Sequence, residues 1–210
     1  MSLSRKICNL FRNKNAQADY IKLLRDSHAE SLRDGKLTMD VGTSRERDLI
    51  TVLCKYFGRD CINWSIPSDF SEDVLIENKP VSIKHLTTTQ RNNCSTLPSF
   101  KIKWTSNADA AERHIEEYIE SEWTDYLIIS EIDNMGVTVN VISPSQVNKI
   151  IKFLKRRAFK KISRKNNIRG IEFSEMTLNL LKYFCKSIRF KADVFSRLLD
   201  PIDKRLYKLT

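Results

Sequence analysis

The chain has 210 residues, of which 41% are hydrophobic, and this is enough to bury one good core. Lys and Arg outnumber Asp and Glu by 36 to 26, which gives a formal net charge of +10. This charge favours a polyanionic partner, with nucleic acid as the first candidate and an anionic membrane surface as the second. The five cysteines form no CxxC pair and the three histidines lie far apart in the sequence, which argues against a zinc site.

The sequence predicts a cytosolic protein. No apolar stretch reaches the roughly 20 residues that span a bilayer, and the basic segment Met1 to Lys14 lacks the apolar run of a signal peptide. In that compartment the cysteines are expected to be reduced.

Apolar spacing predicts helices in the first quarter of the chain. Two helices fit between Leu3 and about Leu32, with a break at 13–15. The next helix is expected to start with Thr43 as its N-cap and to end before Gly58.

Strands and helices then alternate, which predicts an α/β domain with a mixed sheet flanked by helices. A β-hairpin is expected first, with a turn at Asn78-Lys79. The later expected elements are a strand at 100–104, a helix at 108–120 capped by Asn107 or Ser106, strands at 126–129 and 137–142, and a helix from Pro144.

From about Arg156 the composition changes, and the segment to Thr210 is expected to be helical, most clearly at 174–188. The predicted organisation is therefore a core at 1–155 with N-terminal helices, followed by a basic helical lobe at 156–210 that is not independent of it.

The expected turn sets the register of the hairpin. It places Glu77 opposite Pro80 and, four pairs further on, Asp73 opposite Lys84. Side chains alternate between the two faces, so one face collects the β-branched residues and the other collects Asp73, Glu77, Ser82 and Lys84. The β-branched residues are Val74, Ile76, Val81 and Ile83.

Asp73 and Lys84 suit the hydrolysis of a phosphodiester. A carboxylate binds Mg²⁺ through oxygen, and the cation neutralises the phosphate and acidifies a bound water. An ammonium group orients that water or stabilises the pentavalent transition state. These residues also fit a simple cross-strand ion pair, worth roughly 1 kcal/mol or less.

Asp73, the hairpin and Ser82-Ile83-Lys84 resemble the PD-(D/E)XK nuclease signature. In that family an Asp begins one strand and an acid-x-Lys pair lies on the next, so Ser82 replaces the acid here. Some members take the acid from a preceding helix, and Glu46 is the candidate in this chain. The resemblance thus implies catalytic roles for Asp73, Lys84, Glu46 and Ser82, and a Mg²⁺ site made of Asp73, Glu46 and the backbone carbonyl of Ile83.

Glu46 has a second interpretation, because it is the fourth residue of a capping box that begins at Thr43. In that role it would satisfy backbone N–H groups rather than bind a metal.

Contacts with DNA are expected from two regions. A run of basic residues between Lys149 and Arg169 contains no acid and suits the phosphate backbone, and the polar segment after Lys84 suits hydrogen bonding to bases. The residues expected to bind DNA are Gln90, Arg91, Asn92, Asn93, Lys101, Lys103, Lys160, Lys161, Arg164, Lys165, Asn166, Asn167 and Arg169.

The chain length and the basic lobe look like those of a type II restriction endonuclease, which acts as a homodimer on a short palindrome of double-stranded DNA. Ser82-Ile83-Lys84-His85 and the run at 100–104 are also similar to the ThaI-like enzymes, which cut within CGCG and leave blunt ends. Two alternatives stay open: a structure-selective nuclease such as a junction resolvase, and an inactive DNA-binding protein on a nuclease fold.

Overall fold

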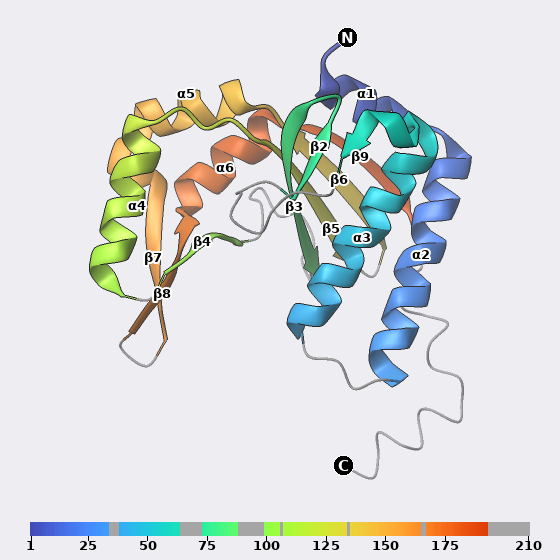
Figure 1. Ribbon diagram of the computed structural model, residues 1–210, viewed down its shortest axis with the longest axis horizontal. Coiled ribbons are helices and arrows are strands. Elements are labelled where there is room, and N and C mark those ends of the chain that lie inside the picture. The colour runs from blue at the N-terminus through green and yellow to red at the C-terminus, as the bar shows by residue number, and fades with distance from the viewer. Residues whose placement is uncertain are drawn as a thin grey trace.

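The computed structural model describes residues 1–33, 38–63, 73–87, 99–105, 107–133, 135–164 and 167–192 (Figure 1). Within these ranges, the backbone alone is described for residues 32, 38–43, 87, 164, 167 and 169. Helices in this part of the chain are all too short or too polar to cross a membrane.

Helices and strands alternate along most of the chain, as an α/β fold requires. The helices are α1 (Leu3–Leu10), α2 (Lys14–Arg33), α3 (Thr38–Phe57), α4 (Ala108–Glu120), α5 (Pro144–Leu154) and α6 (Glu175–Phe184), with 3-10 turns at Arg59–Cys61 and Lys155–Ala158. The strands are β1 (Ile62–Asn63), β2 (Val74–Ile76), β3 (Lys79–Thr87), β4 (Lys101–Trp104), β5 (Tyr126–Asp133), β6 (Gly136–Ile142), β7 (Phe159–Arg164), β8 (Asn167–Phe173) and β9 (Lys186–Lys191).

The described strands form two sheets. The larger has six strands in the order β1-β2-β3-β5-β6-β9, and the smaller has three in the order β4-β8-β7. In the larger sheet β3 and β5 run parallel and the other neighbours run antiparallel, so the sheet is mixed, as expected. Helix α4 lies between β4 and β5 in the chain and provides the crossover that a parallel pair needs.

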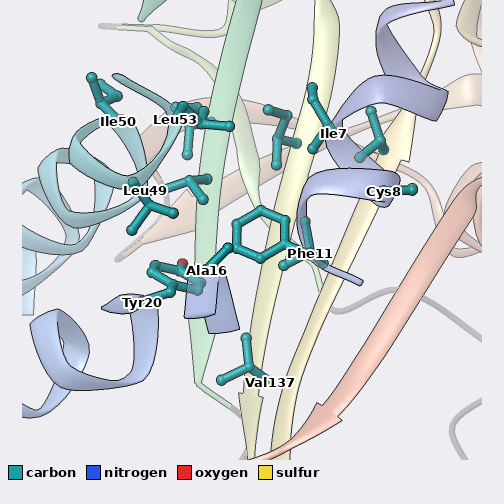
Figure 2. Close-up of a cluster of buried hydrophobic side chains, with 14 of the residues drawn as sticks. Ile7, Cys8, Phe11, Ala16, Tyr20, Leu49, Ile50, Leu53 and Val137 are labelled. Atoms are coloured by element: carbon teal, nitrogen blue, oxygen red, sulfur yellow. The ribbon is translucent and has the colours of Figure 1, made fainter. Parts of the chain in front are cut away.

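The larger sheet is covered on both faces. Helices α1 to α3 pack on one face, where Phe11, Tyr20 and Leu49 join strand residues such as Val137 in one core (Figure 2). Residues of α4, α5, α6 and the smaller sheet form a second core on the other face. Strand β5 contributes Ile128 to the first core and Ile129 to the second, which explains its continuous apolar run.

Helix α3 begins earlier than predicted. Its first residue is Thr38, so Thr43 lies inside the helix and is not its N-cap. The end was predicted correctly: Gly58 has a φ of 92° and its N–H donates to the carbonyl of Cys54 at 3.1 Å. Asn107 caps α4, as expected, by accepting a hydrogen bond from the N–H of Ala110 at 2.8 Å.

The prediction of a purely helical segment after Arg156 was wrong. Residues 159–173 form the hairpin β7–β8, and the helix predicted at 174–188 ends at Phe184. Strand β9 follows it and pairs with β6 at the edge of the larger sheet, so the segment completes the core. The apolar residues of β7, Phe159 and Ile162, are three residues apart and lie on opposite faces, so this strand lacks the alternation that would have revealed it. The division of the chain at residue 155 stays a prediction.

Phe11 tests how strongly the N-terminal helices are held to the sheet. Its ring is fully buried and lies 5.5 Å from that of Tyr20 and 5.9 Å from that of Phe190. Phe11→Ala is expected to lower the free energy of unfolding by about 3 to 5 kcal/mol, measured by urea denaturation. The control is Tyr183→Ala, since Tyr183 is 83% exposed, and a similar loss in both variants would contradict this packing.

Candidate active site

The register of the β2–β3 hairpin differs from the prediction by two residues. Val74 pairs with Val81 and Ile76 pairs with Lys79, so the turn is Glu77-Asn78. Both turn residues have positive φ angles, 50° and 60°, as a tight two-residue hairpin turn requires. The predicted turn missed this because Asn78 was placed first in the turn rather than second.

The predicted faces are nevertheless correct, because a shift of two residues preserves the alternation of side chains. The four β-branched residues, Val74, Ile76, Val81 and Ile83, are all fully buried against the N-terminal helices. Ser82 and Lys84 lie on the other face of β3. The ladder no longer places Asp73 directly opposite Lys84.

Asp73 still reaches Lys84, because it lies just before β2 and its side chain extends toward β3. Its backbone N–H donates to the carbonyl of Val81 at 3.0 Å. Its Oδ2 accepts hydrogen bonds from the N–H of Ile83 at 2.5 Å and from the ammonium of Lys84 at 3.4 Å. Both side chains are about three quarters buried, so the pair is more protected than a surface ion pair.

Glu46 joins this pair from α3. Its pKa is raised from 4.5 to about 7, mainly by burial and then by the negative charge of Asp73, and Lys84 partly offsets this. Because α3 begins at Thr38, Glu46 lies inside the helix, and the capping-box interpretation is wrong. The helix therefore holds a second, partly buried carboxylate within electrostatic range of Asp73.

The donor set fits a hard divalent cation. Two carboxylates that repel each other in a partly buried place gain from a cation between them. The N–H of Ile83 points toward Asp73. The N–H and C=O of one strand residue point to the same side of the strand, so the Ile83 carbonyl also points to the Asp73 side and away from β5. The described residues hold no group of three His, Cys, Asp or Glu side chains in metal-binding geometry.

His85 points to the opposite face of β3 from Lys84, as its position in the strand predicts. Both ring nitrogens are buried without a hydrogen-bond partner among the described residues. Burial lowers the pKa of the ring to about 3, with a smaller contribution from Arg45 and Lys84. The imidazole is therefore neutral at physiological pH.

Beside Ser82 lies an open cleft of about 240 Å³ that the sequence did not predict. Ser82 itself is 6% exposed and lies at the wall of this cleft. The other lining residues come from β4, α4 and the segment that follows α4: Ile102, Glu117, Tyr118, Ser121, Glu122, Trp123, Thr124 and Asp125. In the sequence, only the aromatic residues Tyr118 and Trp123 could have indicated this cleft. Such residues are equally typical of an ordinary hydrophobic core.

Those residues expected to bind DNA that the structure describes lie on the smaller sheet. Lys101 and Lys103 are in β4, and Lys160 and Lys161 are in β7. Gln90, Arg91, Asn92, Asn93, Lys165 and Asn166 lie outside the described residues, and the side chains of Arg164, Asn167 and Arg169 are also not described. Lys160 forms an ion pair with Glu172 at 3.0 Å, and both Lys161 and Arg156 pair with Glu112.

Residues 10–191 match the family model of restriction endonuclease ThaI, which is most of the chain. The chain belongs to the ThaI restriction endonuclease family. This membership supports a site-specific DNA nuclease. No curated protein sequence matches the chain.

A solved structure supports the fold assignment of this ThaI family member. It is described as a restriction endonuclease in complex with substrate DNA, and it superposes with a TM-score of 0.73 at 23% sequence identity. The alignment covers 97% of this chain and 98% of the other. The six-stranded mixed sheet and its flanking helices are therefore those of a restriction endonuclease fold.

The position of Glu46 can be tested by protein stability in EDTA. Its folded pKa lies above its unfolded value, so ionisation destabilises the fold as the pH rises from about 4.5 through about 7. Glu46→Gln removes this ionisable group and is expected to be more stable than the wild type at pH 8. The gain in the free energy of unfolding should be only about 1 to 2 kcal/mol, because the carboxylate is partly exposed to solvent. The difference should vanish near pH 4.5.

Urea denaturation at both pH values measures this effect. Glu120→Gln on α4 is the control, because Glu120 is exposed. Adding Asp73→Asn should reduce the effect of Glu46→Gln, and an unchanged effect would contradict their proximity.

Proposed function

We propose that this ThaI family member is a Mg²⁺-dependent type II restriction endonuclease of the PD-(D/E)XK kind, with Asp73, Lys84 and Glu46 as its catalytic residues. The observation that carries the proposal is the junction of three charges: Asp73 Oδ2 lies 3.4 Å from the Lys84 ammonium, and Glu46 approaches both from α3. A simple ion pair does not require a second, partly buried carboxylate beside it.

Asp73, Glu46 and the Ile83 carbonyl would hold the cation. When bound, Mg²⁺ would supply charge neutralisation at the scissile phosphate and acidify a water. The hydrogen bond from the Ile83 N–H fixes the Asp73 carboxylate, which leaves its Oδ1 to face a ligand. In this arrangement Glu46 would replace the acidic residue that the PD-(D/E)XK signature has at the position of Ser82.

Lys84 would act on the reacting atoms. Asp73 holds its ammonium close to the metal ligands, where it can orient the attacking water and donate to a phosphate oxygen as negative charge develops. Ser82 lies two residues before Lys84, on the same face of β3. Its small side chain would leave room for the phosphate.

Substitutions at the site should abolish cleavage without abolishing DNA binding. Asp73→Asn and Lys84→Ala are each expected to reduce the rate of plasmid cleavage by about 100-fold or more, since each removes a group that acts on the transition state. The measurement is single-turnover cleavage, with DNA affinity by gel shift beside it. Full cleavage by both variants would refute the assignment.

Metal removal provides an independent test. Cleavage should stop in EDTA and return on addition of excess Mg²⁺, while Ca²⁺ should support binding with little cleavage. Glu46→Gln should raise the Mg²⁺ concentration needed for half-maximal activity by about tenfold or more, because it removes a charged ligand. Glu120→Gln serves as its control, and an unchanged Mg²⁺ requirement in Glu46→Gln would exclude Glu46 as a ligand.

We further propose a cytoplasmic homodimer that cuts both strands of a short palindrome, CGCG with blunt ends by resemblance to the ThaI-like enzymes. Two copies related by a two-fold axis match the symmetry of such a site. Sequencing the termini of a digested plasmid should give blunt 5′-phosphate ends at this sequence. Cutting of branched DNA alone would favour a junction resolvase.

A further inference from the structure

The two faces of the small β4-β8-β7 sheet carry different sets of basic residues. The ladders align Lys101 with Glu172 and Lys160, and Trp104 with Gly170 and Ile162. Paired residues share a face, so these six residues form one surface, called here the Trp104 face. Lys103 and Lys161 both pair with Ile171, which is fully buried, and so they lie on the face that packs toward α4.

An irregularity in β4 produces this division. Between Lys101 and Lys103 the register shifts, so that two residues of β4 advance by one residue of β8. Lys101 and Lys103 would share a face in a regular strand, but here they lie on opposite faces.

On the face toward α4, acidic side chains offset the lysines. Lys161 pairs with Glu112. The pKa of Glu117 is lowered, mainly by its hydrogen bond with His114 and in part by the charge of Lys103. Lys161 is therefore neutralised by a carboxylate of α4, and Lys103 lies within electrostatic range of another.

On the Trp104 face, the Lys101 ammonium lies 3.3 Å from the centroid of the Trp104 ring. Gly170 makes room for this contact, because a Cβ there would lie 3.4 Å from Cδ of Lys101 and 2.8 Å from the carbonyl of Lys103. Trp104 is still 59% exposed, which is unusual for tryptophan, a residue that is highly buried on average. Among the described residues, no carboxylate forms an ion pair with the Lys101 ammonium, and Glu172 on the same face pairs with Lys160.

Strand β4, which carries Lys101 and Trp104, lies close to the proposed catalytic strand. Ile102, between the two lysines, lines the same cleft as Ser82 of β3. DNA whose phosphate reaches Lys84 would therefore pass near β4.

We propose that the Trp104 face binds the sugar and phosphate backbone of the substrate DNA, with Lys101 on a phosphate and the indole of Trp104 against a deoxyribose. This inference rests on the proposed function. Lys101 covers one face of the ring, which leaves that face closed to a stacked base. A contact of this kind strengthens binding to any sequence and responds to salt.

The test measures the affinity of variants for two labelled duplexes, one with the cleavage site and one random, in EDTA at several salt concentrations. Trp104→Ala and Lys101→Ala should each weaken binding about three- to tenfold, by the same factor for both duplexes. Lys101→Ala should also reduce the slope of log affinity against log salt by about one. Trp104→Phe should retain most of the affinity.

Tyr183→Ala is the control, since it removes another exposed aromatic side chain from α6. Wild-type affinity in Trp104→Ala and Lys101→Ala would overturn the inference, and so would a loss confined to the duplex with the cleavage site. Either result leaves the proposed function intact as long as the wild type cuts in Mg²⁺ and Asp73→Asn does not.

Discussion

The Asp73 carboxylate is the constraint on which the proposed active site depends. One oxygen, Oδ2, accepts the N–H of Ile83 and the ammonium of Lys84, so it joins the start of β2 to the middle of β3. A hydrogen bond from backbone to carboxylate is worth about 1.5 to 3 kcal/mol and fixes the direction of the acceptor. The Lys84 ammonium and the Ile83 N–H thereby meet at one carboxylate oxygen, which a loose surface ion pair would not achieve.

The rest of the fold brings Glu46 to that point. Helix α3 packs on the sheet through Leu49, Val52 and Leu53, which share one core with Val81 and Ile83 on the buried face of the hairpin. The same packing leaves Glu46 partly buried beside Asp73, where its ionisation is unfavourable. The core thus stabilises the fold and also keeps the carboxylates of Glu46 and Asp73 close enough to repel each other. A divalent cation between them would relieve this repulsion.

Local patterns in the sequence were enough to predict the face of each hairpin residue, the end of α3 at Gly58 and the cap of α4, because alternation, glycine and Asn are local signals. The start of α3 was missed because Thr43-x-x-Glu46 imitates a capping box, and the hairpin turn was placed one residue too late. Strand β9 was taken for helix because its pairing partner, β6, lies far back in the chain, which the local pattern does not reveal. The opposite faces of Lys101 and Lys103 depend on a register shift that only the structure displays.

The central claim is that Asp73, Glu46 and Lys84 form one metal-dependent site, and the most direct test is crystallographic. A crystal of the protein with duplex DNA and Mn²⁺ should give an anomalous peak about 2.1 Å from carboxylate oxygens of both Asp73 and Glu46 and near the Ile83 carbonyl. The Lys84 ammonium should lie within hydrogen-bond distance of the scissile phosphate or of a water beside it. A Mn²⁺ ion bound at the scissile phosphate without Asp73 or without Glu46 would contradict the account.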